Sequence, residues 1–482
     1  ASSALVTVSD AAFSTSSATI AATALSDIGG KTSGAVTVTK AVKITGAAAD
    51  LKNTLVSGSS LVIASSALVT VSDAAFSTSS ATIAATALSD IGGKTSGAVT
   101  VTKAVKITGS TADLTNTMVS SSSSVIAAKA LVTVSDAAFS TSSTAIAATT
   151  LSNIGGKTTG AVTLQNKVRL QGSQSEVATA LVGGSSVAAS QANTEARVTT
   201  TVNVNQGEEI AGVNNVQGIF ASGVSDSLSS LASGGNSTAK LNTITGDDGD
   251  VAITVSDSGF TTTSATLTAA DLIAVGGKTT GTVTVTNAVK ISGNTADLTN
   301  TLVSGSSSVT ASSALVTVSD AAFSTSSATI AATALSDIGG KTSGAVTVTK
   351  AVKITGAAAD LKNTLVSGSS LVIASSALVT VSDAAFSTSS ATIAATALSD
   401  IGGKTSGAVT VTKAVKITGS TADLTNTMVS SSSSVIAAKA LVTITDAAFT
   451  TSSTTIAATT LSNIGGKTTG TVVANNAIKI TG

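Results

Sequence analysis

Internal repetition is the feature that most constrains how this chain can fold. The stretch GGKTSGAVTVTKAVKITG occupies residues 29–46 and returns unchanged at 92–109, 339–356 and 402–419. Gly-Gly-Lys triplets are spaced by 63 residues, except for one interval of 121, and begin at Gly29, Gly92, Gly155, Gly276, Gly339, Gly402 and Gly465. Such a sequence predicts a repeat array, because each repeat buries its apolar face only against the next.

Each 63-residue repeat divides into two half-repeats, since residues 4–34 align with 35–66 and both segments begin with Val-Thr-Val. In 36–39 valine and threonine alternate with the period of a strand that has one buried face. If the strand continued, the side chain of Lys40 would point inward as the valines do. An unpaired charge is unfavourable there, so we expect the chain to turn at Thr39–Lys40. The segments 16–30 and 48–59 have spacings closer to helical and predict short helical turns, with extended structure as the alternative.

These patterns predict a mainly β fold, a parallel β-solenoid of half-repeats about 31 residues long, with one short helical turn per coil. A winding of three smaller coils per repeat would satisfy the same period. The structural rival is a string of small β-sandwiches of 63 residues each, which is thin for two packed sheets.

Composition excludes several classes of function. Basic and acidic residues number 25 each and together make up 10% of the chain, so there is no field of one sign to attract nucleic acid or anionic lipid. His and Cys are absent, which removes catalytic triads of the usual kind, imidazole metal sites and thiolate chemistry. No apolar run approaches the ~18 residues of a membrane span. We expect the chain not to be an enzyme.

Stacked half-repeats predict columns of like residues. Seven of the eight phenylalanines share one position of the repeat, and we expect them to form a buried aromatic column: Phe13, Phe76, Phe139, Phe260, Phe323, Phe386 and Phe449. Asp10 aligns with Lys40, as Asp73 does with Lys103, which predicts alternating charges along one corner. A column of basic residues is interpreted as a solvated face, with a weak polyanion stripe as the alternative: Lys43, Lys106, Arg169, Lys290, Lys353, Lys416 and Lys479.

The outward threonines suggest a further hypothesis, ice binding, because a regular ladder of hydroxyl and methyl groups would cover a flat sheet. The ladder of the first repeats contains Thr7, Thr37, Thr70, Thr100, Thr133 and Thr163. Threonine is also simply a favourable outward residue in a strand.

A divergent segment, 194–251, interrupts the array and marks three expected regions: solenoid repeats at 1–193, the divergent segment, and solenoid repeats at 252–482. Every Arg and Glu lies in 169–209. Asp247, Asp248 and Asp250 could offer oxygen ligands to Ca²⁺, although the spacing of known calcium loops is absent and a solvated loop explains them as well. They are the one metal site that the sequence predicts, and no other cofactor is expected.

The Ser/Thr/Ala/Val/Gly-rich repeats resemble the β-strand repeats of very large bacterial surface proteins, especially cyanobacterial ones. The residues that carry this resemblance are Ile-Thr-Gly at 107–109 followed by Ala-Asp-Leu at 112–114, and the Lys-Thr-Ser/Thr-Gly-x-Val motif. The resemblance implies a secreted, elongated, non-catalytic protein, and it assigns no functional residue.

We therefore expect a structural protein of an extracellular filament, sheath or surface layer that associates with itself. Residues 1–133 recur as 311–443, so the sequence is expected to belong to a longer repeating protein. The alternative function is an adhesin stalk or viral tail fibre in which the divergent segment makes the contact or binds Ca²⁺. Expected partners are copies of the chain itself, a surface glycan or a neighbouring cell-surface protein, and not nucleic acid.

Overall fold

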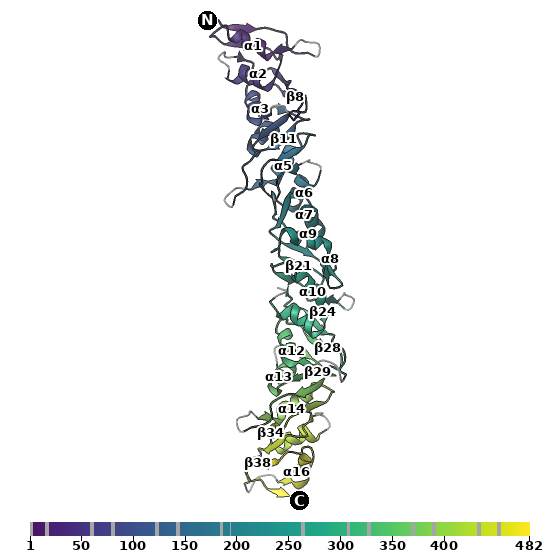
Figure 1. Ribbon diagram of the computed structural model, residues 1–482. Helices are drawn as coiled ribbons and strands as arrows, with labels where there is room; N and C mark the ends of the chain where they lie inside the picture. Colours follow the sequence, from purple (N-terminus) through teal and green to yellow (C-terminus); the bar gives the residue numbers. More distant parts are fainter. Residues whose placement is uncertain are drawn as a thin grey trace. The chain divides into compact units, whose positions relative to one another are not determined.

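The computed structural model describes residues 3–14, 19–57, 62–78, 82–120, 125–140, 145–183, 187–192, 194–261, 266–305, 309–324, 329–367, 372–387, 392–430, 435–450 and 455–482. The chain forms two compact units (Figure 1). Unit 1 contains Ala1–Val224 and Thr243–Val251, and unit 2 contains Ser225–Asn242 and Ala252–Gly482. The divergent segment is thus divided between the two units.

Unit 1 is built from short parallel strands that pair with strands 22–30 residues away in the chain. In pairing order, its sheets are β1 (Val6–Val8), β3 (Val36–Val38), β5 (Val62–Ile63); β2 (Ile20–Ala21), β4 (Lys43–Gly46), β6 (Leu68–Val71), β8 (Val99–Val101), β10 (Val125–Ile126); β7 (Ile83–Ala84), β9 (Lys106–Gly109), β11 (Leu131–Val134), β13 (Val162–Leu164), β15 (Val187–Ala189); and β12 (Ile146–Ala147), β14 (Arg169–Gly172), β16 (Thr194–Val198), β17 (Val216–Phe220).

Unit 2 repeats this organisation and adds one antiparallel hairpin, β19 (Ala232–Ser233) with β20 (Asn236–Ser237). Its parallel sheets are β18 (Val224–Asp226), β21 (Ile253–Val255), β23 (Val283–Val285), β25 (Val309–Thr310); β22 (Leu267–Thr268), β24 (Lys290–Gly293), β26 (Leu315–Val318), β28 (Val346–Val348), β30 (Val372–Ile373); β27 (Ile330–Ala331), β29 (Lys353–Gly356), β31 (Leu378–Val381), β33 (Val409–Val411), β35 (Val435–Ile436); β32 (Ile393–Ala394), β34 (Lys416–Gly419), β36 (Leu441–Ile444), β38 (Val472–Ala474); and β37 (Ile456–Ala457), β39 (Ile480–Thr481).

Short helices alternate with the strands. The α-helices are α1 (Ala22–Gly29), α2 (Ala48–Lys52), α3 (Ala85–Gly92), α4 (Thr111–Leu114), α5 (Ala148–Gly155), α6 (Gln174–Leu181), α7 (Val204–Ala211), α8 (Leu228–Leu231), α9 (Ala239–Asp247), α10 (Ala269–Gly276), α11 (Thr295–Leu298), α12 (Ala332–Gly339), α13 (Ala358–Lys362), α14 (Ala395–Gly402), α15 (Thr421–Leu424) and α16 (Ala458–Gly465). Single π-helical turns follow five of them: η1 (Asn53–Ser57), η2 (Thr115–Val119), η3 (Thr299–Val303), η4 (Asn363–Ser367) and η5 (Thr425–Val429).

The prediction of short parallel strands is confirmed, but "mainly β" understates the helices. Helical residues make up 31% and strand residues 28%. Each predicted helical segment contains a helix, at 22–29 and at 48–57, but Ile20–Ala21 is the strand β2, and residues 16–18 and 58–59 lie outside the described residues. Successive helices α1, α2 and α3 contact one another (Figure 1). Alanine explains the excess, because it is both the best helix former and small enough for helices to pack closely beside the strands.

The strand register matches the predicted alternation. Val6 pairs with Val36 and Val8 with Val38, with these valines facing the interior, and the chain turns between β3 and β4 at Thr39–Lys40 as expected. The spacing is less uniform than the half-repeat alignment predicts. Ile20 pairs with Ile44, 24 positions later, whereas Val6 pairs with a residue 30 positions later.

The Lys-Thr-Ser-Gly motif joins the two ends of one half-repeat through the backbone. The Thr32 hydroxyl donates a hydrogen bond to the Ala4 carbonyl and accepts one from the Gly34 N–H at 3.0 Å. A Cβ on Gly34 would lie 2.4 Å from the same Ala4 oxygen, so only glycine permits this approach. The motif recurs because the same backbone contact recurs in each repeat.

A buried threonine links successive helices. Thr54, 1% exposed, lies in η1 and donates a hydrogen bond to the Ala22 carbonyl of α1, 32 residues earlier, at 3.0 Å. Equivalent bonds run from Thr117, Thr301, Thr364 and Thr427. A buried hydroxyl satisfied in this way stabilises the stack, whereas an unsatisfied one would destabilise it.

The repeated aspartates accept hydrogen bonds from the backbone of the preceding half-repeat, and their alternation with lysines along one corner stays a prediction. Asp73 accepts a hydrogen bond of 2.7 Å from the Ala48 N–H, the first residue of α2 in the preceding half-repeat. The same contact is made by Asp136, Asp320, Asp383 and Asp446. At α2 and α13 the carboxylate replaces a missing side-chain cap, because an alanine precedes the helix, whereas α4, α11 and α15 are also capped by Ser or Asn.

The core contains small aliphatic side chains, as the composition suggests. Its largest fully buried members are leucines and isoleucines such as Leu25, Ile44 and Leu51, surrounded by Val and Ala. Among the helices that the structure describes, all are too short or too polar to cross a membrane.

We expect Gly407→Ala to lower the free energy of unfolding by about 1–3 kcal/mol, the usual cost of overpacking. Its Cβ would lie 2.2 Å from the Ala377 carbonyl oxygen. The control is Gly259→Ala, where no atom lies within 4 Å of the new Cβ. Urea unfolding followed by circular dichroism measures both variants, and equal stability of the two would contradict the close approach.

Candidate functional site

The repeated phenylalanines lie on the surface beneath basic side chains. Each ring is covered by the basic residue of the facing strand, in the pairs Phe13–Lys43, Phe76–Lys106, Phe139–Arg169, Phe260–Lys290, Phe323–Lys353, Phe386–Lys416 and Phe449–Lys479. The lysine Nζ atoms lie 4.9–5.5 Å from the ring centroids, and Arg169 Cζ lies 3.7 Å away. The prediction of a buried aromatic column is therefore wrong.

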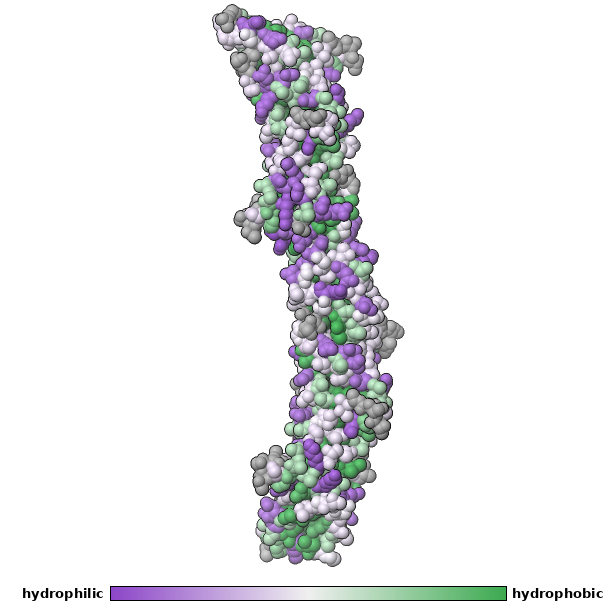
Figure 2. Space-filling view, in the orientation of Figure 1, coloured by the Kyte–Doolittle hydropathy of each residue, from purple (hydrophilic) through white to green (hydrophobic). Residues whose placement is uncertain are grey.

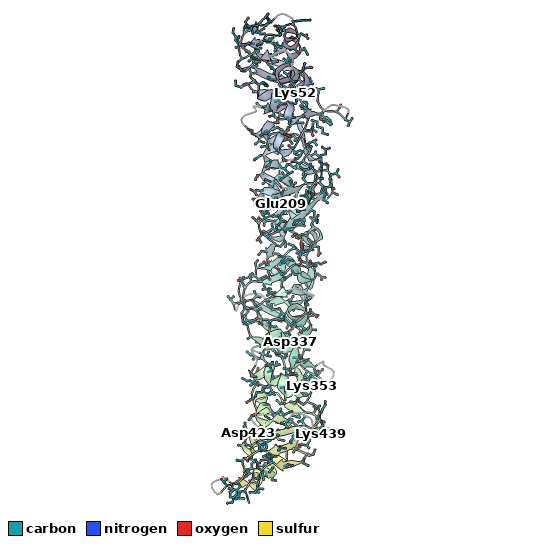
Figure 3. The ribbon with its side chains drawn as sticks, turned by 90° about the vertical axis from the view of Figure 1, so that its left-hand side faces the viewer. Lys52, Glu209, Asp337, Lys353, Asp423 and Lys439 are labelled. Atoms are coloured by element: carbon teal, nitrogen blue, oxygen red, sulfur yellow. The ribbon has the colours of Figure 1, made fainter. Side chains whose placement is uncertain are left out.

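Backbone hydrogen bonding explains why the ring and the cation meet. The Phe323 N–H donates to the Ala351 carbonyl at 2.8 Å, which places the ring beside Lys353 of β29. Lys353 is labelled in Figure 3. An exposed cation–π contact is worth about 0.5–1 kcal/mol. Each cation of the basic column thus lies over an aromatic ring and keeps its positive charge, and a solvated face stays the prediction for this column.

A cleft of about 540 Å³ opens on the outer face of one sheet in unit 1. Its floor contains three threonines in register on neighbouring strands, Thr108 on β9, Thr133 on β11 and Thr163 on β13. Phe76 and Lys106 line one side of it, and Gln165 and Ser190 also line it. Its volume lies in the range of small-molecule sites.

The threonine ladder is shorter than the sequence predicts. Thr37 pairs with Thr7 on one side and with Ile63, not Thr70, on the other. Thr45, Thr70 and Thr100 form a separate ladder that ends at Ile126. These interruptions follow from the uneven strand spacing, and they divide the hydroxyl lattice that ice binding would need.

Two of the three aspartates predicted to bind Ca²⁺ end a sheet. Strand β17 is the edge of its sheet, and its Gly218 and Phe220 N–H groups donate to Asp247 Oδ2 at 2.8 Å and to Asp248 Oδ2 at 2.7 Å. The carboxylates thereby occupy the positions that carbonyls of a further strand would take. Asp250, in contrast, is exposed.

The surroundings of this pair raise its affinity for protons. Burial raises the pKa of Asp248 to about 6, and the Asp250 and Asp247 carboxylates add to the rise, while the Phe220 N–H opposes it. Burial also raises the pKa of Asp247, against the Gly218 hydrogen bond. Among the described residues, no group of three or more His, Cys, Asp or Glu side chains is arranged to hold a metal ion. Ca²⁺ binding at these aspartates stays a prediction.

An ion pair in the same region was not predicted. Arg169 on β14 donates from Nε and Nη2 to the two oxygens of Glu195 on β16, at 2.6 and 2.9 Å. The register that pairs these residues on adjacent strands makes the fork-like contact possible. The sequence does show that every Arg and Glu lies in 169–209. Which of them pair depends on the strand register, so the sequence did not predict this ion pair.

Comparison with known proteins adds no assignment. No protein-family model matches the chain, and no curated protein matches it significantly. The geometry of the described residues therefore carries the functional argument.

We expect Asp248 to make unit 1 less stable as pH rises. Its folded pKa of about 6 lies above the usual 3.8, so its contribution is fully present below about pH 3.8 and is lost as pH rises through 6. The loss corresponds to about 3 kcal/mol. Asp248→Asn, whose Oδ1 still accepts from the Phe220 N–H, should therefore gain stability relative to the wild type between about pH 4 and pH 7 in urea unfolding.

The exposed Asp337 provides the control for this measurement (Figure 3). Asp337→Asn makes the same change of side chain at an exposed position away from the edge strand β17. If the difference in unfolding free energy between the wild type and Asp248→Asn stays constant with pH, a raised pKa at Asp248 is refuted.

Proposed function

We propose that the chain is a non-catalytic structural repeat protein of an extracellular filament, sheath or surface layer, in which the half-repeats wind as a parallel β-solenoid. The observation that carries the proposal is the use of the repeated polar residues. Thr54 and Asp73, with their equivalents, make hydrogen bonds to the preceding half-repeat, and Thr32 and its equivalents bond to the residue 28 positions earlier in the chain. Repetition of these residues extends the array. Their side chains bond to the protein itself and not to a substrate.

The surface is compatible with a structural role. The visible face is mostly pale in Figure 2, with scattered strongly hydrophilic side chains, in keeping with a charged fraction of 10% and equal numbers of both signs. Such a surface has little long-range repulsion to oppose close packing of copies. The extracellular location rests on the sequence resemblance and is part of the proposal.

Self-association is supported by the pairing rules inside the chain. Valine pairs with valine and threonine with threonine at positions that each repeat carries, as in Val69–Val99 and Thr70–Thr100. A strand from a second copy carries the same side chains as a strand of the first copy. It would therefore pair with an exposed sheet edge in the same way. We propose that copies associate through such edges.

An adhesin stalk or tail fibre is the second candidate, favoured by the β19–β20 hairpin in the divergent segment. Gly234 and Gly235 form its tip with φ angles of 61° and 77°, and both are exposed. The Gly235 N–H donates to Asp271 Oδ1 at 2.6 Å, which holds the tip in place. A fixed, exposed turn is suited to contact, and this function requires no assembly of copies.

Deletion of one complete repeat, residues 339–401, tests the solenoid. The deletion joins Ile338 to Gly402 and preserves the local sequence. A solenoid should keep its cross-section and shorten by roughly 10–15 Å, two to three strand spacings. Small-angle X-ray scattering measures both quantities.

Deletion of half a repeat, residues 339–369, is the matched control. It brings unlike strands into register and should lower the thermal unfolding temperature more than the complete deletion does. If the two deletions are equally tolerated, the repeats do not stack in the proposed way.

The structural role predicts assembly. Negative-stain electron microscopy and sedimentation velocity should show filaments or lattices as the concentration of the chain increases. A chain that remains monomeric at high concentration would contradict the structural proposal and favour the adhesin alternative.

A further inference from the structure

The threonine-floored cleft of unit 1 owes its depth to a local departure from the repeat. In four other sheets the strand after the last outward threonine carries an exposed isoleucine, in the pairs Thr37–Ile63, Thr100–Ile126, Thr347–Ile373 and Thr410–Ile436. These isoleucines are 41–52% exposed. At the cleft the corresponding pair is Thr163–Ala188, so the bulky side chain is missing. The third repeat therefore opens a space that these four sheets fill.

The floor of the cleft presents hydroxyl groups that are free to bind. Thr108, Thr133 and Thr163 lie on adjacent strands, which are separated by about 4.8 Å. Within the described residues, their hydroxyls make no hydrogen bond to protein. Thr133 is only 8% exposed, whereas its equivalents Thr70 and Thr380 are half-buried. The hydroxyls thus form a regular row of donors and acceptors at the bottom of a recess.

The side of the cleft combines an aromatic ring with a cation. Phe76 lines it together with Lys106, whose Nζ lies 5.2 Å from the ring centroid. Gln165 adds an amide where the earlier repeats carry threonine, as at Thr102. No acidic residue is among the described residues that line the cleft, so its charge is positive.

We propose that this cleft binds an acidic saccharide, a sugar chain that carries carboxylate groups. Sugar hydroxyls match the threonine row, the C–H face of a sugar ring can pack against Phe76, and a carboxylate can pair with Lys106 in a charge-assisted hydrogen bond. The proposal does not depend on the proposed structural function, because a monomeric chain would contain the same cleft.

Other ligand classes fit the cleft less well. A peptide added as a strand needs a free sheet edge, whereas the cleft lies over the faces of β9, β11 and β13, which have neighbours on both sides. A nucleic acid needs several cations to neutralise its phosphates, and the lining provides Lys106 alone.

The test is calorimetric titration of the full chain with an oligogalacturonate, with a neutral oligogalactose of the same length as the comparison. The acidic sugar should bind more tightly, and added salt should weaken its binding. Lys106→Gln should weaken it about tenfold through loss of one charge-assisted hydrogen bond. Ala188→Ile introduces the side chain carried by the repeats without this cleft, and it should abolish binding.

The repeats supply the matched control, because residues 1–133 recur as 311–443. Lys416, whose Nζ lies 5.2 Å from the Phe386 centroid, is the equivalent of Lys106. Lys416→Gln should leave binding unchanged, and circular dichroism should show that all variants fold. Absence of binding, equal binding of both sugars, or an equal loss in Lys106→Gln and Lys416→Gln would each overturn the proposal.

Discussion

Parallel backbone hydrogen bonds between half-repeats impose the condition on which the remaining structure depends. Strands only two to five residues long cannot be stable alone, so each parallel strand must pair with a strand 22–30 residues away in the chain. The backbones can approach only where side chains are minimal. Gly34 lies against the Ala4 carbonyl, and a Cβ on Gly46 would lie 2.8 Å from the Ala22 Cβ. Close approach, rather than large hydrophobic side chains, therefore determines the composition of the chain.

The charged residues are used in ways that keep this stack regular. Aspartates cap helices of the preceding half-repeat, as Asp73 does for α2, and lysines cover phenylalanine rings. Both contacts satisfy a charge at the surface without burying it, which avoids the desolvation penalty of an internal ion pair. Asp247 and Asp248 do the reverse: they bring charge to a sheet edge and end the sheet at β17. Continuation and termination of the sheets are thus both controlled by carboxylates.

Departures from the repeat are where binding chemistry can arise. A residue that occurs in each repeat is committed to stacking, so a new site must come from a position where one repeat differs. Ala188 stands in place of isoleucine next to Thr163 of the threonine-floored cleft, and the divergent segment supplies the β19–β20 hairpin. A structural array with one or two specialised repeats would combine length with recognition, in agreement with the proposed function and independent of how copies assemble.

The sequence by itself determined the parallel pairing of Val-Thr-Val strands, the turn at Thr39–Lys40 and the helical segments, because each follows from local periodicity repeated many times. It did not determine the position of the phenylalanines, since an aromatic residue in a repeat suits a core as well as a surface. Parallel strand spacings that vary between 22 and 30 residues decided which side chains meet. Only the register between strands placed Lys106 over Phe76, joined Arg169 to Glu195 and aligned three threonines beneath an open cleft. Contacts across strands depend on the spacing of the paired strands and not on local sequence.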